Sequence, residues 1–251
     1  SWFHSFVPSV QAYFARLFER SDVAYFCQDY PLIPLAKRLA RRVVVHLHDY
    51  QPICYNSIVM APAHRQHLDL CGQVLWEARF EILEHESPSK ALMGSLLAPT
   101  VTQYKRWVSE ADSIICVSAR HAEIVSHFAQ GLKSKIRIVH NPLPPVALME
   151  KEDVPRPAFL YVGGDSYVKG FHTFLDASRK LLQSNPNVRF ILTKEFGATH
   201  KRFLNRLNAT SADAYALLGR VGYDEVAKLC SITHGLIFPS IWEETWGYAV
   251  M

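Results

Sequence analysis

Short apolar runs alternate along this chain with segments of helical periodicity, and this alternation restricts the fold more than any other feature. A continuous apolar run of four to eight residues suits a strand that is covered on both faces of its sheet. Such runs occupy residues 22–27, 43–47, 113–118, 136–140, 158–162, 188–193 and 235–239. Because strands separated by helices pair in parallel, the pattern predicts an α/β protein with doubly wound parallel sheets.

The segments between these runs carry helix signals. Ser118 precedes a segment in which Ala122, Val125 and Phe128 fall on one face. A serine in that place predicts an N-cap, because its hydroxyl can accept a hydrogen bond from a free amide of the first turn. By the same argument Asp224 is predicted to cap a short helix in the second half of the chain.

Five prolines within residues 142–157 separate two such α/β regions. Proline lacks an amide hydrogen and fixes φ, so neither a helix nor a central strand is expected there. We therefore predict a linker at 142–157 between an N-terminal domain, 1–141, and a C-terminal domain, 158–251. A long surface loop within one domain is the alternative. Ligands of doubly wound sheets bind beyond the carboxyl ends of the strands, so we expect the ligand in a cleft between two lobes.

The composition excludes several classes of protein. With 49% apolar and 20% charged residues, the chain is typical of a globular protein and not of a disordered one. The net charge of +4, from 27 basic and 23 acidic residues, is too small to indicate a nucleic-acid partner, and no basic stripe interleaved with aromatic residues accompanies it. No apolar run approaches the roughly 18 residues that a membrane-spanning helix needs.

The cysteines and the chain ends bear on location and completeness. Five scattered cysteines are poor material for a disulfide framework, so we expect a reducing compartment and a cytoplasmic protein. The chain opens at Ser1 without a signal-peptide pattern and stops at Met251 directly after apolar residues. We therefore expect a fragment that is incomplete at both termini.

A glycine-rich loop follows the predicted strand 158–162. Gly163 and Gly164 allow close backbone approach, and Lys169 adds a positive charge just before the next predicted helix. Amides at a helix N-terminus together with a lysine suit a phosphate group. The loop is neither a P-loop nor a GxGxxG sequence, so a glycine turn with a solvated lysine is the alternative.

A second candidate lies near the end of the chain. Glu243 and Glu244 stand between Trp242 and Trp246, directly after the predicted strand 235–239. Sugar rings pack on aromatic faces, and carboxylates accept hydrogen bonds from hydroxyl groups, so this segment predicts a sugar pocket. The start of a helix, where glutamates are favourable, is the alternative.

Several short motifs follow one another in a specific order. They are LHDYQPIC at 47–54, VS at 117–118, HNP at 140–142, VG at 162–163 with KG at 169–170, LGRV at 218–221, FPS at 238–240 and ETWGY at 244–248. In this order the set resembles the retaining GT-B glycosyltransferases of family 4, over roughly residues 20–251. The resemblance implies two Rossmann-like lobes with parallel sheets facing a cleft. It also implies transfer of a sugar from a nucleotide-diphosphate sugar to an acceptor with retention of anomeric configuration, without a metal or other cofactor.

The resemblance also assigns roles to single residues. These are catalysis by Glu244 and His48; donor-phosphate binding by Lys169, Gly163 and Gly164; donor-sugar binding by Glu244, Gly247 and Tyr248; and nucleotide binding by Arg220, Val221 and Ser240. For retention without an evident nucleophile, the resemblance implies attack from the face of the leaving group. Positive charge would then be needed where the diphosphate departs.

Two departures from the family pattern matter. The arginine that usually follows the strand-end glycine is Gly164 here, so neutralising the phosphates requires another cation. The second glutamate of the family motif would be residue 252, one past Met251, and we expect the fragment by itself to be inactive. A nucleotide-sugar-binding module without turnover is therefore the alternative function.

Metal binding is a weaker hypothesis. Cys54, His64, His67 and Cys71 offer four zinc ligands, but their spacing lies outside the usual zinc patterns, and we favour a site without metal.

The expected partners follow from these hypotheses. They are a nucleotide-sugar donor and a glycan, lipid-linked or small-molecule acceptor, with no nucleic acid. Basic residues at 37, 38, 41 and 42 flank a short amphipathic stretch that could contact the inner face of a membrane, although a solvated helix face is the preferred interpretation.

Overall fold

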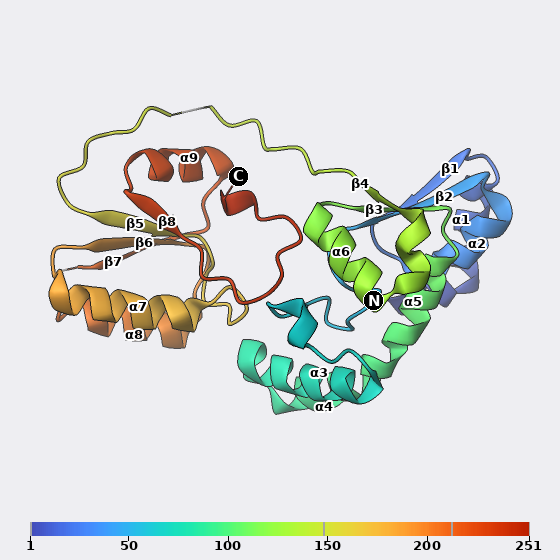
Figure 1. Ribbon diagram of the computed structural model, residues 1–251, viewed down its shortest axis with the longest axis horizontal. Coiled ribbons are helices and arrows are strands. Elements are labelled where there is room, and N and C mark those ends of the chain that lie inside the picture. Colours follow the sequence, from blue (N-terminus) through green and yellow to red (C-terminus); the bar gives the residue numbers. More distant parts are fainter. Residues whose placement is uncertain (1, 148, 212, 251) are drawn as a thin grey trace. The chain divides into compact units, whose positions relative to one another are not determined.

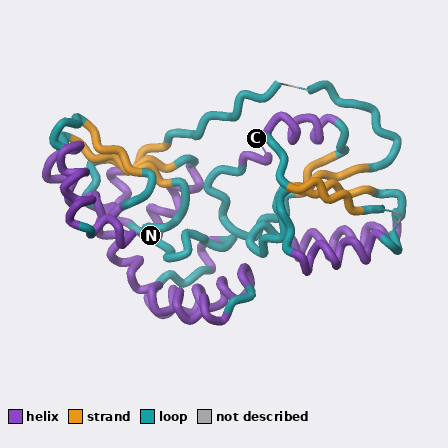
Figure 2. The backbone as a smooth tube through the Cα atoms, turned by 180° about the vertical axis from the view of Figure 1, so that it is seen from behind, coloured by secondary structure: helices purple, strands orange, loops and turns teal. Residues whose placement is uncertain are grey.

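The computed structural model describes residues 2–147, 149–211 and 213–250, so Leu148 of the predicted linker lies outside the described residues. The chain forms two compact units. Unit 1 comprises 1–141 and 242–246, and unit 2 comprises 142–241 and 247–251. This division differs from the predicted domains in two places, because the predicted linker 142–157 belongs to unit 2 and Trp242–Trp246 packs with the N-terminal part of the chain. Both units combine strands and helices (Figures 1 and 2).

Unit 1 contains a four-stranded parallel sheet with helices between its strands. In chain order its elements are η1 (Trp2–Phe6), α1 (Pro8–Phe18), β1 (Val23–Phe26), η2 (Tyr30–Leu32), α2 (Ile33–Leu39), β2 (Arg42–Leu47), η3 (Ala63–Arg65), α3 (Leu70–His85), α4 (Pro88–Leu97), η4 (Ala98–Thr100), α5 (Val101–Ser109), β3 (Ser113–Cys116), α6 (Ala119–Phe128), η5 (Gln130–Lys135) and β4 (Ile136–Ile138). The strands pair in sequence order, β1-β2-β3-β4.

The two faces of this sheet differ in burial. Side chains alternate between the faces of a strand, and Val43, Val45 and Leu47 of β2 are fully buried in the core with helices α2 and α5. The intervening residues Val44 and His46 are only half-buried. The expectation that these strands are covered on both faces is therefore wrong for the part of unit 1 that the structure describes.

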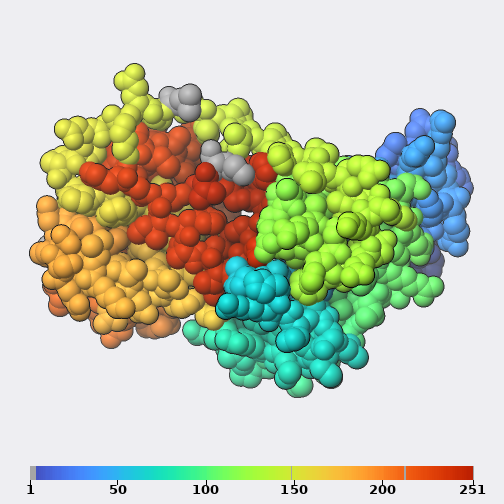
Figure 3. Space-filling model, in the orientation of Figure 1, coloured from blue at the N-terminus to red at the C-terminus, as the bar shows by residue number. Residues whose placement is uncertain are grey.

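Helices α3 and α4 form an antiparallel hairpin with an unusual polar interior. The inward side of α3 carries Gln73 and Glu77, which are each 2% exposed. A Cβ on Gly94 of α4 would come within 2.6 Å of a Glu77 carboxylate oxygen, so glycine allows the two helices to approach. The hairpin lies at the surface, drawn in cyan to green in Figure 3, and exposes Leu75 and Leu96.

Unit 2 contains a second four-stranded parallel sheet. Its elements are β5 (Ala158–Tyr161), α7 (Phe171–Ser184), β6 (Arg189–Thr193), α8 (Ala198–Asn208), β7 (Tyr215–Gly219), α9 (Tyr223–Ser231), β8 (Gly235–Ile237) and η6 (Tyr248–Val250). The strand order is β7-β6-β5-β8, so the direction of winding reverses at β5. Reversal of this kind marks a doubly wound sheet and places its ligand crevice beyond the strand ends.

Alternating side chains of β5 and β6 build a core on each face of the unit 2 sheet. Tyr161 and Phe190 pack with helices α7 and α8, whereas Leu160 and Ile191 pack with Leu229 of α9. Figure 1 accordingly shows α7 and α8 on one face and α9 on the other. This parallel sheet is therefore covered on both faces, as the apolar runs predicted.

The proline-rich segment contains neither helix nor strand in its described residues, 142–147 and 149–157. Its second half is fastened to unit 2. The Lys151 ammonium donates hydrogen bonds to the carbonyl oxygens of Cys230 and Thr233, and the Glu152 amide donates to the Ser231 carbonyl oxygen at 3.0 Å.

Some of the predicted local features are confirmed and others are wrong. The Ser118 hydroxyl accepts a hydrogen bond from the amide of His121, so Ser118 caps α6 as predicted. Asp224 does not cap α9, because the N-cap position is Gly222 and Asp224 lies within the first turn. Of the basic stretch, helix α2 buries Ile33 and Ala36 and leaves Lys37 and Arg38 at the surface, as a solvated helix face requires.

No helix among the described residues is both long enough and apolar enough to cross a membrane.

Buried Glu77 makes the stability of the α3–α4 hairpin depend on pH. Burial, with a smaller contribution from Glu81, raises the pKa of Glu77 from 4.5 to about 7. Between these two values the folded chain binds a proton that the unfolded chain has released, so the free energy of unfolding falls as pH rises through this range.

We predict that Glu77→Gln removes this fall and raises the free energy of unfolding at pH 8 by about 1–2 kcal/mol, because a buried charge is lost. Urea unfolding at pH 4.5 to 8 measures it. Glu86→Gln, at an exposed site where α3 ends, is the control and should keep the wild-type pH profile. A Glu77→Gln profile parallel to that of the wild type would contradict the prediction.

Candidate functional site

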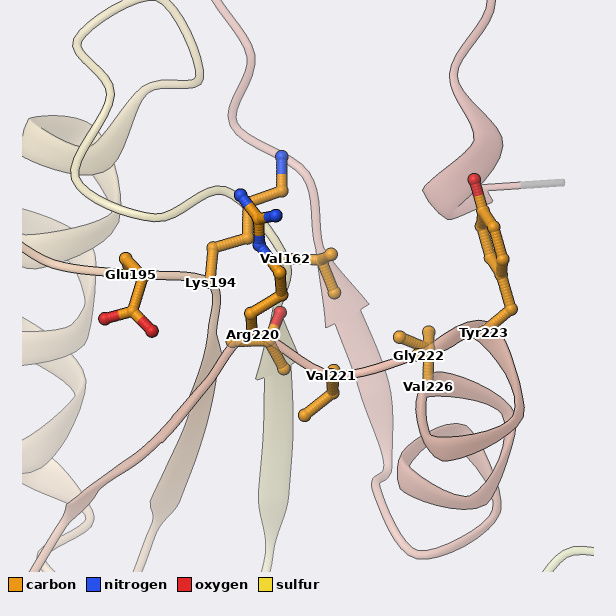
Figure 4. Close-up of a pocket in the computed structure, with 9 residues that line it drawn as sticks. Val162, Lys194, Glu195, Arg220, Val221, Gly222, Tyr223 and Val226 are labelled. Atoms are coloured by element: carbon orange, nitrogen blue, oxygen red, sulfur yellow. The ribbon is translucent and has the colours of Figure 1, made fainter.

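A pocket opens at the carboxyl edge of the unit 2 sheet. Its volume is about 680 Å³, and it lies where β5, β6 and β7 end and α9 begins. Because the strands are parallel, the loops that follow them meet at this edge. The described lining residues are Val162, Thr193, Lys194, Glu195, Arg220, Val221, Gly222, Tyr223 and Val226. Arg220 and Val221, predicted as nucleotide-binding residues, are thus part of one pocket (Figure 4).

Two cationic side chains enter the pocket. Lys194 follows β6 and Arg220 follows β7, and in Figure 4 both extend from the strand ends toward the same side. Glu195 also lines the pocket, but Lys201 of α8 forms an ion pair with it at 3.3 Å. The pocket therefore offers a positive potential to an anionic ligand.

Lys194 was not among the predicted site residues. It adopts a left-handed conformation, φ 69°, and pairs as an isolated bridge with Gly219 at the end of β7. Such a conformation is uncommon for a residue with a side chain and often marks a functional segment. Lys194 directly follows the predicted strand 188–193, and this position at a strand end could have indicated a site residue.

The glycine-rich loop owes its glycines to steric constraints. A Cβ on Gly163 would overlap the Tyr161 hydroxyl group. Gly164 has φ +66°, and a Cβ there would lie 3.1 Å from the Glu195 carbonyl oxygen and 3.4 Å from the Lys194 Cβ. The backbone at Gly164 thus disfavours the arginine of the resembled family, and the side chain of Lys194 stands next to the place where that arginine would begin.

The same loop is tied to its neighbours at both ends. The Asp165 carboxylate accepts hydrogen bonds from the Gly197 amide at 2.6 Å and from His200 Nδ1 at 3.0 Å. These contacts connect the β5–α7 loop to the start of α8. At the other end, Lys169 directly precedes Gly170, the left-handed N-cap of α7.

Ser240 and Gly170 hold the loop that follows β8 against this glycine-rich loop. The Ser240 hydroxyl and the Ile241 amide both donate to the Val168 carbonyl oxygen, at 3.3 and 3.0 Å. A Cβ on Gly170 would overlap the Pro239 carbonyl oxygen. Ser240, predicted to bind the nucleotide, thus has at least this structural role.

Gly247 and Tyr248 belong to unit 2. Gly247 begins the short turn that leads into η6, where the Val250 amide donates to the Gly247 carbonyl oxygen at 3.0 Å. The ring of Tyr248 lies 6.4 Å, between centroids, from that of Tyr223, which lines the pocket. Of the two predicted sugar-contact residues, Tyr248 is therefore close to the wall of the pocket on the α9 side.

His48 and Glu244 both lie in unit 1. His48 follows β2 directly and is exposed. The hydroxyl of Thr245, the residue after Glu244, donates to the His48 carbonyl oxygen at 2.7 Å, which brings the backbones of the two predicted catalytic residues together. The Trp242 indole N–H donates to the Glu244 carboxylate at 2.8 Å and orients it.

His121 supports the turn that carries His48. It is fully buried, and its Nε2–H donates to the Asp49 carbonyl oxygen at 3.0 Å. Burial lowers the pKa of His121 to about 4, so the ring is neutral at pH 7. The neutral His121 ring therefore positions the turn at His48 and Asp49 by its hydrogen bond and not by its charge.

Arg120 holds the segment 242–246 on unit 1. Its guanidinium binds both carboxylate oxygens of Glu243, at 2.6 and 3.1 Å, and also Glu123 at 2.9 Å. This fork, together with a hydrogen bond from the Ala63 amide, lowers the pKa of Glu243. Glu243 therefore fastens the loop, whereas its neighbour Glu244 bonds to Trp242. The partners are 123 residues apart, which is why the sequence did not reveal the pair.

The four residues weighed as zinc ligands do not form a ligand cluster in the described part of the chain. The Cys54 thiol is buried and donates to Asn56 and to the Ile58 carbonyl oxygen, whereas Cys71 is exposed on α3. A different group, Cys27, His46 and His48, brings its ligand atoms together.

Comparison with known proteins supports the architecture. The sequence matches no protein-family model and no curated protein. Among solved structures, HepE of Anabaena in complex with UDP and glucose is 15% identical, with a TM-score of 0.56 over 95% of this chain and 58% of that chain.

Two further structures are similar to the same extent. The pneumococcal O-GlcNAc transferase GtfA in complex with UDP and GlcNAc is 13% identical, with a TM-score of 0.56 over 94% of this chain and 42% of that one. An α,α-trehalose-phosphate synthase (UDP-forming) from Burkholderia vietnamiensis is 14% identical, with a TM-score of 0.53 over 95% and 61%. The chain thus spans about half the length of the structures that it matches.

These likenesses show the fold. The chain has the GT-B architecture, in which each Rossmann-like lobe contains a parallel sheet, and the predicted fold class is confirmed.

Gly170→Ala should destabilise unit 2. The new methyl group meets the Pro239 carbonyl oxygen at a backbone φ of +74°, so we expect a loss of about 2–4 kcal/mol in the free energy of unfolding. Denaturant unfolding measures it. Gly131→Ala is the matched control, because nothing lies within 4 Å of its Cβ position, and it should change stability little. Equal effects of the two substitutions would refute the steric argument.

Arg120→Ala should loosen the segment 242–246. The Glu243 amide donates to the Val59 carbonyl oxygen at 2.8 Å, so its hydrogen exchange reports local opening. We expect exchange about tenfold faster, since loss of a charge-assisted fork costs on the order of 1.5 kcal/mol. Glu123→Ala removes the other carboxylate partner of Arg120 and should leave this exchange rate unchanged.

Proposed function

We propose that this chain is part of a glycosyltransferase that moves a sugar from a nucleotide-diphosphate sugar to an acceptor. The observation that carries the proposal is the cationic pocket at the carboxyl edge of a doubly wound parallel sheet. The complexes of HepE with UDP and glucose and of GtfA with UDP and GlcNAc support it, because their folds are similar. Retention of configuration and membership of family 4 are part of the proposal and rest on the ordered motifs.

Unit 2 supplies the groups for the nucleotide and its phosphates. Arg220 and Val221 contact the nucleotide inside the pocket. Lys169, the amides of Gly163 and Gly164 and the N-terminus of α7 face the diphosphate. Negative charge develops on the diphosphate as the glycosidic bond breaks, so fixed cations stabilise the transition state more than the ground state.

Lys194 supplies the cation that Gly164 lacks. It stands beside Gly164, lines the same pocket as Arg220 and extends in the same direction. This placement answers the strongest sequence argument for a module without turnover, which was the missing arginine. No metal ion is part of this proposal.

Unit 1 supplies the groups assigned to the sugar. Glu244 and His48 orient the hexose, and the hydrogen bond from the Thr245 hydroxyl to the His48 carbonyl oxygen sets the spacing of their backbones. Arg120 is a positioning residue, because it acts on this pair through Glu243. Gly247 and Tyr248 of unit 2 are assigned to the sugar, and Ser240 to the nucleotide, by the ordered motifs.

The acceptor belongs to the proposal only as a class. A glycan, a lipid-linked molecule or a small molecule would each offer the hydroxyl group that the reaction needs. A cytoplasmic location with peripheral membrane contact fits a lipid-linked acceptor.

We predict that Lys194→Ala and Arg220→Ala each weaken the binding of UDP, GDP or ADP by about tenfold or more, because each removes a cation from the phosphate environment. Calorimetric titration at fixed salt identifies the preferred base in the wild type and then measures both variants. Lys180→Ala, which removes an exposed lysine of α7 that is not among the described lining residues, is the control and should bind within about twofold of the wild type.

Transfer by the complete protein tests the activity itself. Glu244→Gln should abolish sugar transfer and leave nucleoside-diphosphate binding intact, because the carboxylate is assigned to the sugar. Nucleotide binding without transfer by the wild type would favour the binding module. Absence of nucleotide binding would refute both functions.

A further inference from the structure

Strand pairing in unit 1 aligns three metal-ligating side chains. The parallel register pairs Tyr25 with Val44 and Phe26 with Val45, so the next residue of the first strand, Cys27, continues opposite His46. Side chains alternate across a strand, so Tyr25, Cys27, His46 and His48 all project from the same face. This is the incompletely covered face of the unit 1 sheet, and Cys27 and His48 are exposed on it.

The ligand atoms of Cys27, His46 and His48 are already close together. One atom from each residue lies within 4.8 Å of the other two. Around a tetrahedral ion with bonds of about 2.0–2.3 Å, ligand atoms are roughly 3.3–3.8 Å apart. The ligand atoms are therefore already within about 1–1.5 Å of the spacing that a tetrahedral ion requires.

His46 is prepared as a ligand. Its Nδ1 is hydrogen-bonded to the Tyr25 hydroxyl, whereas its Nε2 is buried and has no hydrogen-bond partner. Histidines that bind metals usually donate from their second ring nitrogen to a fixed acceptor, which sets the tautomer and the ring orientation. With Nδ1–H donating to Tyr25, Nε2 carries the lone pair, and we take Nε2 as the ligand atom of His46. A bound ion would also satisfy a buried polar atom that is otherwise costly.

We propose that Cys27, His46 and His48 form a binding site for Zn²⁺, with Tyr25 as the positioning residue of His46. One thiolate and two imidazoles favour Zn²⁺ over Mg²⁺ or Ca²⁺, which prefer oxygen ligands. The fourth coordination position opens to solvent, because Cys27 and His48 lie at the surface. The site goes beyond the proposed transfer reaction, and it competes with that reaction for the ring of His48.

Cobalt is the probe, because Co²⁺ occupies zinc sites and gives a thiolate-to-cobalt charge-transfer band. The complete chain is reduced, freed of metal with a chelator and titrated with Co²⁺. We expect the band to saturate at one ion per chain and to vanish on addition of one equivalent of Zn²⁺. Failure of the wild type to give a saturating band would overturn the proposal.

Variants assign the ligands without any use of activity. Cys27→Ser should abolish the band, His46→Ala should weaken binding at least about tenfold, and Tyr25→Phe should weaken it by about tenfold with the stoichiometry unchanged. Cys71→Ser removes an exposed cysteine on α3 and should leave the band as in the wild type. Loss of the band in Cys71→Ser together with its survival in Cys27→Ser would also overturn the proposal. Far-ultraviolet circular dichroism verifies that each variant is folded.

Discussion

Parallel pairing of backbone strands is the constraint on which the rest of this structure depends. When every strand of a sheet points the same way, every following loop emerges at the same edge, whatever its place in the sequence. In unit 2 this brings Val162, Lys194 and Arg220 to one pocket although they follow three different strands. In unit 1 it aligns Cys27 with His46 and His48. Both chemical sites are therefore products of strand register.

Close backbone approach is the second determinant of the unit 2 site. Gly163 leaves room for the Tyr161 hydroxyl, and Gly170 leaves room for the Pro239 carbonyl oxygen. Gly164 adopts a conformation that side chains disfavour, and Lys194, which directly follows the neighbouring strand, lies next to it. In the proposed site Lys194 therefore supplies a positive charge from a different strand end than the one expected from the resemblance.

In unit 1, hydrogen bonds hold the polar residues of the candidate site in place. Glu243 is held by Arg120 and by the Ala63 amide, Glu244 by the Trp242 indole, and His48 by the Thr245 hydroxyl. Charge-assisted and buried hydrogen bonds of this kind fix geometry more than they add stability. A segment of five residues, 242–246, is thereby integrated into a unit from which it is distant in sequence.

The sequence by itself determined the fold class, because apolar runs of strand length separated by helical segments leave few alternatives to parallel sheets. It also indicated that the loop between the predicted strand 158–162 and the next helix carries a charge, since Lys169 lies just before that helix. It missed β7, whose Ala216, Leu217 and Leu218 are equally good helix formers. It also missed the α3–α4 hairpin, where Gln73 and Glu77 occupy the inward face and remove the apolar period.

Only the tertiary structure decided which groups meet. The pairing of Arg120 with Glu243, the neighbourhood of Lys194 and Gly164, and the cluster of Cys27, His46 and His48 all join residues from different elements. Periodicity and propensity describe a residue relative to its chain neighbours, whereas these contacts depend on register and on backbone sterics across a sheet. For this reason the sequence predicted which loops carry polar and charged groups, but it did not predict which side chains contact one another.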